Sequence, residues 1–130
     1  MIRHFIPGIF WGVIILVLSG MPGSYIPEVQ SYLDWLEPDK LVHVLMYAAF
    51  VFLCLYGIYK NRAKSLLKHQ YYVILGIGIA FGGLTEVLQK HLFIGRNGNI
   101  FDFYADILGC LIGLIIYLVY QRKKTVKVRQ

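Results

Sequence analysis

Charged residues are scarce in this chain: only 15% of its 130 residues are charged, and 58% are hydrophobic. A soluble domain carries about a quarter charged residues, and the mean hydropathy of +0.61 is correspondingly high. This composition excludes an ordinary soluble domain. Segments of about ten residues with alternating hydrophobicity are also missing, which excludes a transmembrane β-barrel.

Cysteine is scarce as well, and the familiar catalytic motifs are missing. Cys54 and Cys110 both fall in apolar runs, and neither belongs to a CxxC pair. They therefore indicate small packing residues rather than a disulfide, a metal pair or a nucleophile. The chain has no HExxH sequence, no phosphate-binding loop and no serine in a nucleophile elbow. No cofactor is predicted on this basis.

The sequence does contain four apolar runs. Each is close to the length of about 20 residues that a helix needs to cross a hydrocarbon core of about 30 Å. We therefore expect an all-α, polytopic membrane protein, with residues 1–130 forming a single domain of four transmembrane helices. Apolar residues at helical spacing in the first long loop also suggest a short interfacial helix there, with an ordinary loop as the alternative. The four runs are Phe5–Gly20, Leu41–Tyr59, Tyr72–Gln89 and Phe103–Tyr120.

The charges of the chain are sorted between the two sides of this expected membrane. Ten of the thirteen Lys and Arg residues lie at one side, and all seven Asp and Glu residues lie at the other. By the positive-inside rule, both termini are predicted to be cytoplasmic, with a basic tail at 121–130 near anionic headgroups. The net charge of +6 comes without an aromatic-interleaved surface, so no nucleic-acid partner is predicted.

Polar side chains recur at the outer ends of the last three runs. Asp39, His43 and Tyr47 are spaced i, i+4 and i+8, which places them on one face of a helix. Ionisable groups at membrane depth are costly, so they usually face a bundle interior, a cavity or one another. We therefore expect three helices to contribute to one polar pocket. The candidate binding residues are Asp39, Lys40, His43, Tyr47, Glu86, Gln89, Arg96, Asp102 and Asp106.

Several of these residues also have purely structural explanations. Asp39 and Asp102 suit helix N-caps, and Asn99 with Asp102 forms a capping-box-like start. Tyr47 suits packing, and Gln89 suits the end of a helix. Lys40 suits a solvated position at the membrane interface. Capping does not explain the other four, which are His43, Glu86, Arg96 and Asp106, although a hydrogen-bond network that locks the bundle is an alternative for them. A divalent metal bound by His43, Glu86, Asp102 and Asp106 is a further alternative. One imidazole and several carboxylates can bind Zn, Mn or Mg, but these residues do not form a compact metal-binding motif.

Five short motifs follow one another along the chain: Ser19-x-x-Pro22-Gly23-Ser24, Asp39-Lys40-x-x-His43-x-x-x-Tyr47, Glu86-x-x-Gln89, Gly95-Arg96 and Asp102-x-x-x-Asp106-x-x-Gly109-x-x-x-Gly113. With these motifs in this order, the chain resembles the VanZ-like family of bacterial membrane proteins. The resemblance implies an integral protein of the bacterial cytoplasmic membrane and a cell-envelope setting. The family is named for an accessory protein of glycopeptide-resistance clusters, so a link to antibiotic resistance is also implied.

Three functions are compatible with this pattern. The first is binding of a lipid headgroup, a cell-wall precursor or a glycopeptide, with Arg96 and Lys40 contacting phosphate or carboxylate. The second is an intramembrane hydrolase or transferase acting on a lipid-linked substrate, with His43, Glu86 and Asp106 as the catalytic candidates. A small transporter or channel is least favoured, because nothing polar continues through residues 51–55 or 111–118.

Overall fold

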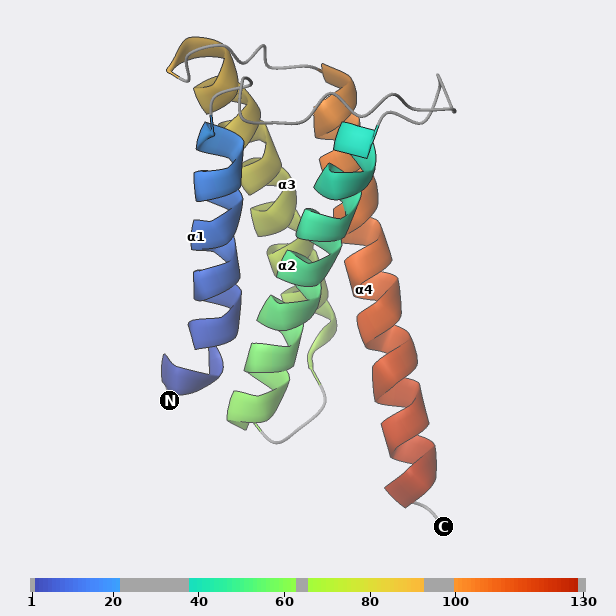
Figure 1. Ribbon diagram of the computed structural model, residues 1–130. Coiled ribbons are helices and arrows are strands. Elements are labelled where there is room, and N and C mark those ends of the chain that lie inside the picture. Colours follow the sequence, from blue (N-terminus) through green and yellow to red (C-terminus); the bar gives the residue numbers. More distant parts are fainter. Residues whose placement is uncertain (1, 22–37, 63–65, 93–99, 129–130) are drawn as a thin grey trace.

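The structure, a computed structural model, describes residues 2–21, 38–62, 66–92 and 100–128. These residues form a short 3-10 turn, η1 (Ile2–His4), and the helices α1 (Ile6–Gly20), α2 (Pro38–Arg62), α3 (Lys68–His91) and α4 (Ile100–Val128). The four α-helices run alternately in opposite directions, so both termini lie at one end of the bundle (Figure 1). We call this the terminal end, and the end that holds Gly20, Pro38, His91 and Ile100 the distal end. The possible interfacial helix and Arg96 fall outside the described residues.

Three of these helices are long and apolar enough to cross a membrane, namely α2, α3 and α4. Helix α1 has 15 residues, which corresponds to about 22 Å at the helical rise of 1.5 Å per residue. Large apolar side chains are exposed on the outside of every one of the four helices, including Phe10, Leu45, Val87 and Ile115. A soluble monomer rarely exposes apolar surface on this scale. The all-α prediction with four helices is confirmed, and a multi-pass membrane protein is consistent with it.

The helix ends differ from the predicted ones. Helices α2, α3 and α4 all extend beyond the apolar runs, and α4 continues to Val128. The basic tail at 121–130 is therefore helical as far as Val128. Hydropathy marks only the part of a helix that suits hydrocarbon, whereas Lys, Arg and Gln are good helix formers and carry the helix further. Asp39 is also not an N-cap, because α2 begins at Pro38 and Asp39 lies within the first turn. Proline is favoured at this position, since its missing N–H has no partner in the first turn.

Helix α2 lies at the centre of the bundle and packs against α1, α3 and α4. Its fully buried residues Tyr47, Val51 and Leu55 form the core together with Ile15 of α1 and Cys110 of α4. Both cysteines are free, as the sequence indicated.

Small residues bring the helix backbones close together. A Cβ atom at Gly109 would clash with the carbonyl oxygen of Val44, and one at Gly113 would clash with that of Ala48. Helix α4 therefore lies directly against the backbone of α2. A Cβ at Gly82 of α3 would lie 3.0 Å from the Cβ of Asp106. The GxxxG spacing of Gly109 and Gly113 is typical of helices whose backbones lie close together, and the structure identifies α2 as the partner of this face.

Candidate functional site

The centre of the candidate site is a buried pair between α2 and α4. Nδ1 of His43 lies 2.8 Å from Oδ1 of Asp106, and the two side chains are only 2% and 0% exposed. His43 comes five residues after the start of α2 and Asp106 six residues after the start of α4. Both therefore lie about 7.5–9 Å below the distal end at 1.5 Å per residue. Gly109 lies one turn further along α4, where its lack of a side chain lets the two helices approach.

Helix α3 adds Glu86 to this pair, and we call His43, Glu86 and Asp106 the inner cluster. One ligand atom from each of these residues lies within 4.8 Å of the others. Glu86 is 9% exposed. Oδ2 of Asp106 is buried and has no hydrogen-bond partner among the described residues. It lies on the side facing α3, since a Cβ at Gly82 would be 3.0 Å from it. The inner cluster thus joins three helices in the bundle interior.

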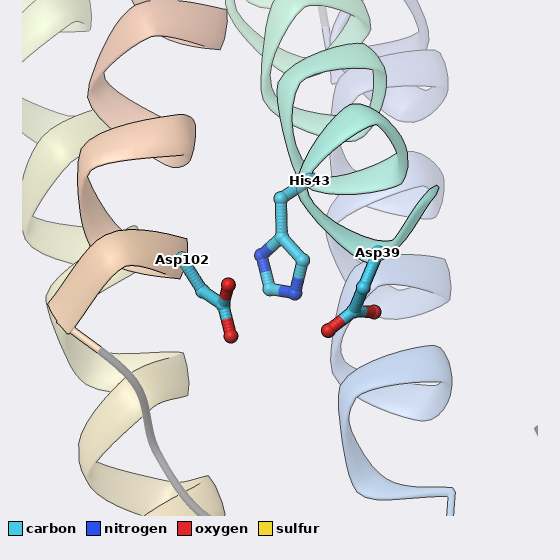
Figure 2. Close-up of side chains that lie close together, drawn as sticks. All are labelled: Asp39, His43 and Asp102. Atoms are coloured by element: carbon cyan, nitrogen blue, oxygen red, sulfur yellow. The ribbon is translucent and has the colours of Figure 1, made fainter. Parts of the chain in front are cut away.

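A second group of acids lies on the distal side of His43. Asp39, His43 and Asp102, which we call the outer cluster, also offer ligand atoms within 4.8 Å of one another. Figure 2 shows the imidazole ring of His43 between the two carboxylates, one from α2 and one from α4. Asp102 is 7% exposed. Because Nδ1 is engaged by Asp106, the nitrogen left for the outer cluster is Nε2.

Neutral polar groups support the inner cluster from below. The hydroxyl of Thr85 donates to the carbonyl oxygen of Gly82 at 2.9 Å. Its single proton is used there, so the hydroxyl of Tyr47 donates to Thr85 at 2.7 Å. Both side chains are fully buried. This chain of hydrogen bonds ties α2 to α3 beneath the ionisable residues.

Two further predicted residues, Gln89 and Lys40, make contacts near the distal end. Gln89 donates a hydrogen bond from Nε2 to the carbonyl oxygen of Ser19 at 3.3 Å. It therefore pairs with a backbone group at the end of α1, which agrees with the structural explanation given above for this residue. The ammonium of Lys40 lies 6.0 Å from the centroid of the Phe101 ring at the distal end. Thr85 was not among the candidate binding residues, although its position directly before Glu86 on α3 was the available signal.

The chemistry of the two clusters follows from their charges. Four carboxyl groups surround one imidazole, so the site attracts cations and disfavours bare anions. A carboxylate on one nitrogen of a histidine fixes the tautomer and the ring orientation, which prepares the other nitrogen to bind a metal or to accept a proton. Nε2 of His43 is the atom that this arrangement prepares.

Comparison with known proteins finds a distant relative of the chain but no assigned family. Over 119 residues the chain is 26% identical to an uncharacterized protein of the fission yeast Schizosaccharomyces pombe. The match covers 90% of this chain and 66% of the yeast protein, so the chain spans just under two thirds of that relative's length. No protein-family model matches the chain, and no solved structure matches it. The description of the yeast protein names no activity, so the VanZ-like resemblance stays a prediction.

Proposed function

We propose that the chain is a VanZ-like, multi-pass membrane protein that binds the phosphate-bearing headgroup of a lipid or of a lipid-linked envelope precursor at its distal end. One observation supports this most strongly. The ionisable residues of three helices gather in one buried centre one to two turns below the distal end. Placing ionisable residues inside a membrane protein costs free energy, and such residues commonly mark a binding or reaction site.

The charge distribution supports an orientation for this site. The basic residues flank the terminal end and the acidic residues flank the distal end, so by the positive-inside rule we place both termini in the cytoplasm. The two clusters then lie in the outer leaflet of a bacterial cytoplasmic membrane. The relative described above comes from a yeast, so the bacterial setting and the role in glycopeptide resistance derive from the resemblance alone.

Lys40 provides positive charge for a phosphate group at the distal end. It lies beside Asp39, on the first turn of α2, with its ammonium over the ring of Phe101. Arg96, outside the described residues, is the second cation that we propose for the headgroup. The carboxylates below would repel a phosphate, so a cation between the phosphate and the outer cluster favours binding.

Lipid binding to the purified full chain in detergent tests the proposal. Native mass spectrometry would compare phosphatidylglycerol, a polyprenyl phosphate and a glycopeptide as ligands, which separates the three sources of binding. We expect Lys40→Ala to weaken binding of the phosphate-bearing lipid about tenfold, the effect of losing about 1.4 kcal/mol. Lys90→Ala is the matched control, because Lys90 is exposed in the last turn of α3 at the same end. Equal retention of lipid by the wild type and both variants would contradict the proposal.

An intramembrane hydrolase or transferase is the second candidate, and the His43–Asp106 pair favours it. A histidine oriented by a buried carboxylate is the usual form of a general base. Loss of turnover of a labelled lipid-linked substrate in His43→Gln, with helix content unchanged, would establish this role. A transporter or channel remains least favoured, because Val51, Leu55 and Cys110, which are buried below Tyr47, are apolar.

A further inference from the structure

We infer that the outer cluster is a divalent metal site for Zn²⁺ or Mn²⁺. The ligands are a carboxylate oxygen of Asp39, Nε2 of His43 and a carboxylate oxygen of Asp102. Asp106 is a positioning residue that holds the imidazole from its other side.

The geometry of the outer cluster fits three ligands of one ion. Metal–ligand bonds of about 2.0–2.2 Å in a tetrahedral arrangement place neighbouring ligand atoms about 3.4 Å apart. The ligand atoms of Asp39, His43 and Asp102 lie within 4.8 Å of one another, so small side-chain rotations complete the site. The carboxylates approach the ring from both sides (Figure 2), one from each of two helices.

The state of His43 is a separate observation that points to a ligand. Its side chain is 2% exposed, yet its hydrogen bond within the described part of the chain uses Nδ1 alone. Nε2 is thus the ring nitrogen left to face the two carboxylates of the outer cluster, and it makes no hydrogen bond with the described residues. An imidazole that is held by a carboxylate on one nitrogen, with two further carboxylates beside the other nitrogen, has the arrangement of a metal-binding histidine.

Asp106 explains why the ion belongs in the outer rather than the inner cluster. A metal-binding histidine almost always donates its other ring N–H to a carboxylate or carbonyl group. Asp106 occupies that position on Nδ1 at 2.8 Å. An ion in the inner cluster would have to compete with Asp106 for Nδ1. In the outer cluster the hydrogen bond and the metal bond use different nitrogens.

The donor set indicates the kind of ion. One imidazole with two carboxylates suits first-row divalent ions such as Zn²⁺ and Mn²⁺, whereas sulfur ligands, which favour softer metals, are absent from the outer cluster. Three protein ligands leave at least one coordination position open for water or for a phosphate oxygen. The use of that position by a headgroup rests on the function proposed above, whereas the metal site itself does not.

Metal titration of the purified full chain in detergent tests the inference. The protein is stripped with a chelator, dialysed and titrated with Zn²⁺ by calorimetry, with Mn²⁺ as competitor and elemental analysis for stoichiometry. We expect one Zn²⁺ per chain. Asp39→Asn, His43→Ala and Asp102→Asn should each weaken binding at least about 100-fold, and Asp106→Asn about 10–100-fold, as supporting carboxylates do elsewhere.

Two controls separate this site from its alternatives. His91→Ala removes an exposed imidazole from the same end of the bundle and should leave the affinity unchanged. Glu86→Gln removes a carboxylate of the inner cluster alone and should also leave it unchanged. A loss in Glu86→Gln without a loss in Asp39→Asn would move the ion to the inner cluster and overturn the inference.

A measurement on the wild type keeps the test decisive even if a variant misfolds. X-ray absorption of the Zn²⁺-loaded chain should show one imidazole and otherwise oxygen ligands at about 2.0–2.2 Å. No bound metal, or a shell of several imidazoles, would refute the site. Lipid binding without metal binding would refute this inference alone, and metal binding without lipid binding would refute the proposed function alone.

Discussion

The contact between α4 and α2 gives a quantitative prediction about bundle stability. A Cβ atom at Gly113 would lie 3.0 Å from both the Cα and the carbonyl carbon of Ala48 and closer still to its oxygen. These are backbone atoms, so they cannot rotate away as a side chain would. Gly113→Ala must therefore push α4 from α2, and forcing extra volume into packed structure costs about 1–3 kcal/mol.

Gly76→Ala is the matched control for this change. Gly76 also lies in a membrane-length helix, and a Cβ there would meet nothing within 4 Å. Both substitutions gain the same helix propensity, about 1 kcal/mol in favour of alanine. The difference between the two variants thus isolates the helix contact, and we expect Gly113→Ala to be less stable than Gly76→Ala by about 1–3 kcal/mol.

The assay is reversible unfolding of the full chain in bicelles by titration with sodium dodecyl sulfate, followed by tryptophan fluorescence. The two variants and the wild type are measured under identical lipid conditions. If Gly113→Ala and Gly76→Ala unfold at the same detergent fraction, α4 does not lie against the backbone of α2. The position of Asp106 relative to His43 would then have to be revised as well.

Two further predictions use the same protein. Tyr47→Phe removes the hydroxyl that donates a hydrogen bond to Thr85. It should lower the free energy of unfolding by about 1 kcal/mol or less, the usual range for hydrogen bonds between membrane helices. The detergent titration measures this change, and an unfolding midpoint equal to that of the wild type would contradict the hydrogen bond. Both termini should be cytoplasmic under the positive-inside rule, so a fluorescent reporter fused at Gln130 should be bright and a periplasmic phosphatase reporter fused there should be inactive. The opposite pair of signals would invert the proposed orientation.

Much of the fold could be predicted because it depends on local properties of the sequence. Helix formation in apolar surroundings requires every backbone group to be paired within the helix, so the apolar runs indicated all four helices. The helix ends were missed at Pro38 and Val128, because polar residues with good helix propensity extend a helix beyond its apolar part. The structural role of Gln89 was also predictable from its place near the end of a run.

The sequence by itself determined that ionisable residues would lie inside the bundle near one end. Only the tertiary structure decided which of them meet. His43 and Asp106 are 63 residues apart in the chain, and their contact depends on how closely α4 approaches α2 at Gly109. Helical periodicity gives the face of each residue on its own helix but not the rotation of one helix against another. That rotation is set by packing between helices, and here it makes a single imidazole, that of His43, part of both the inner and the outer cluster.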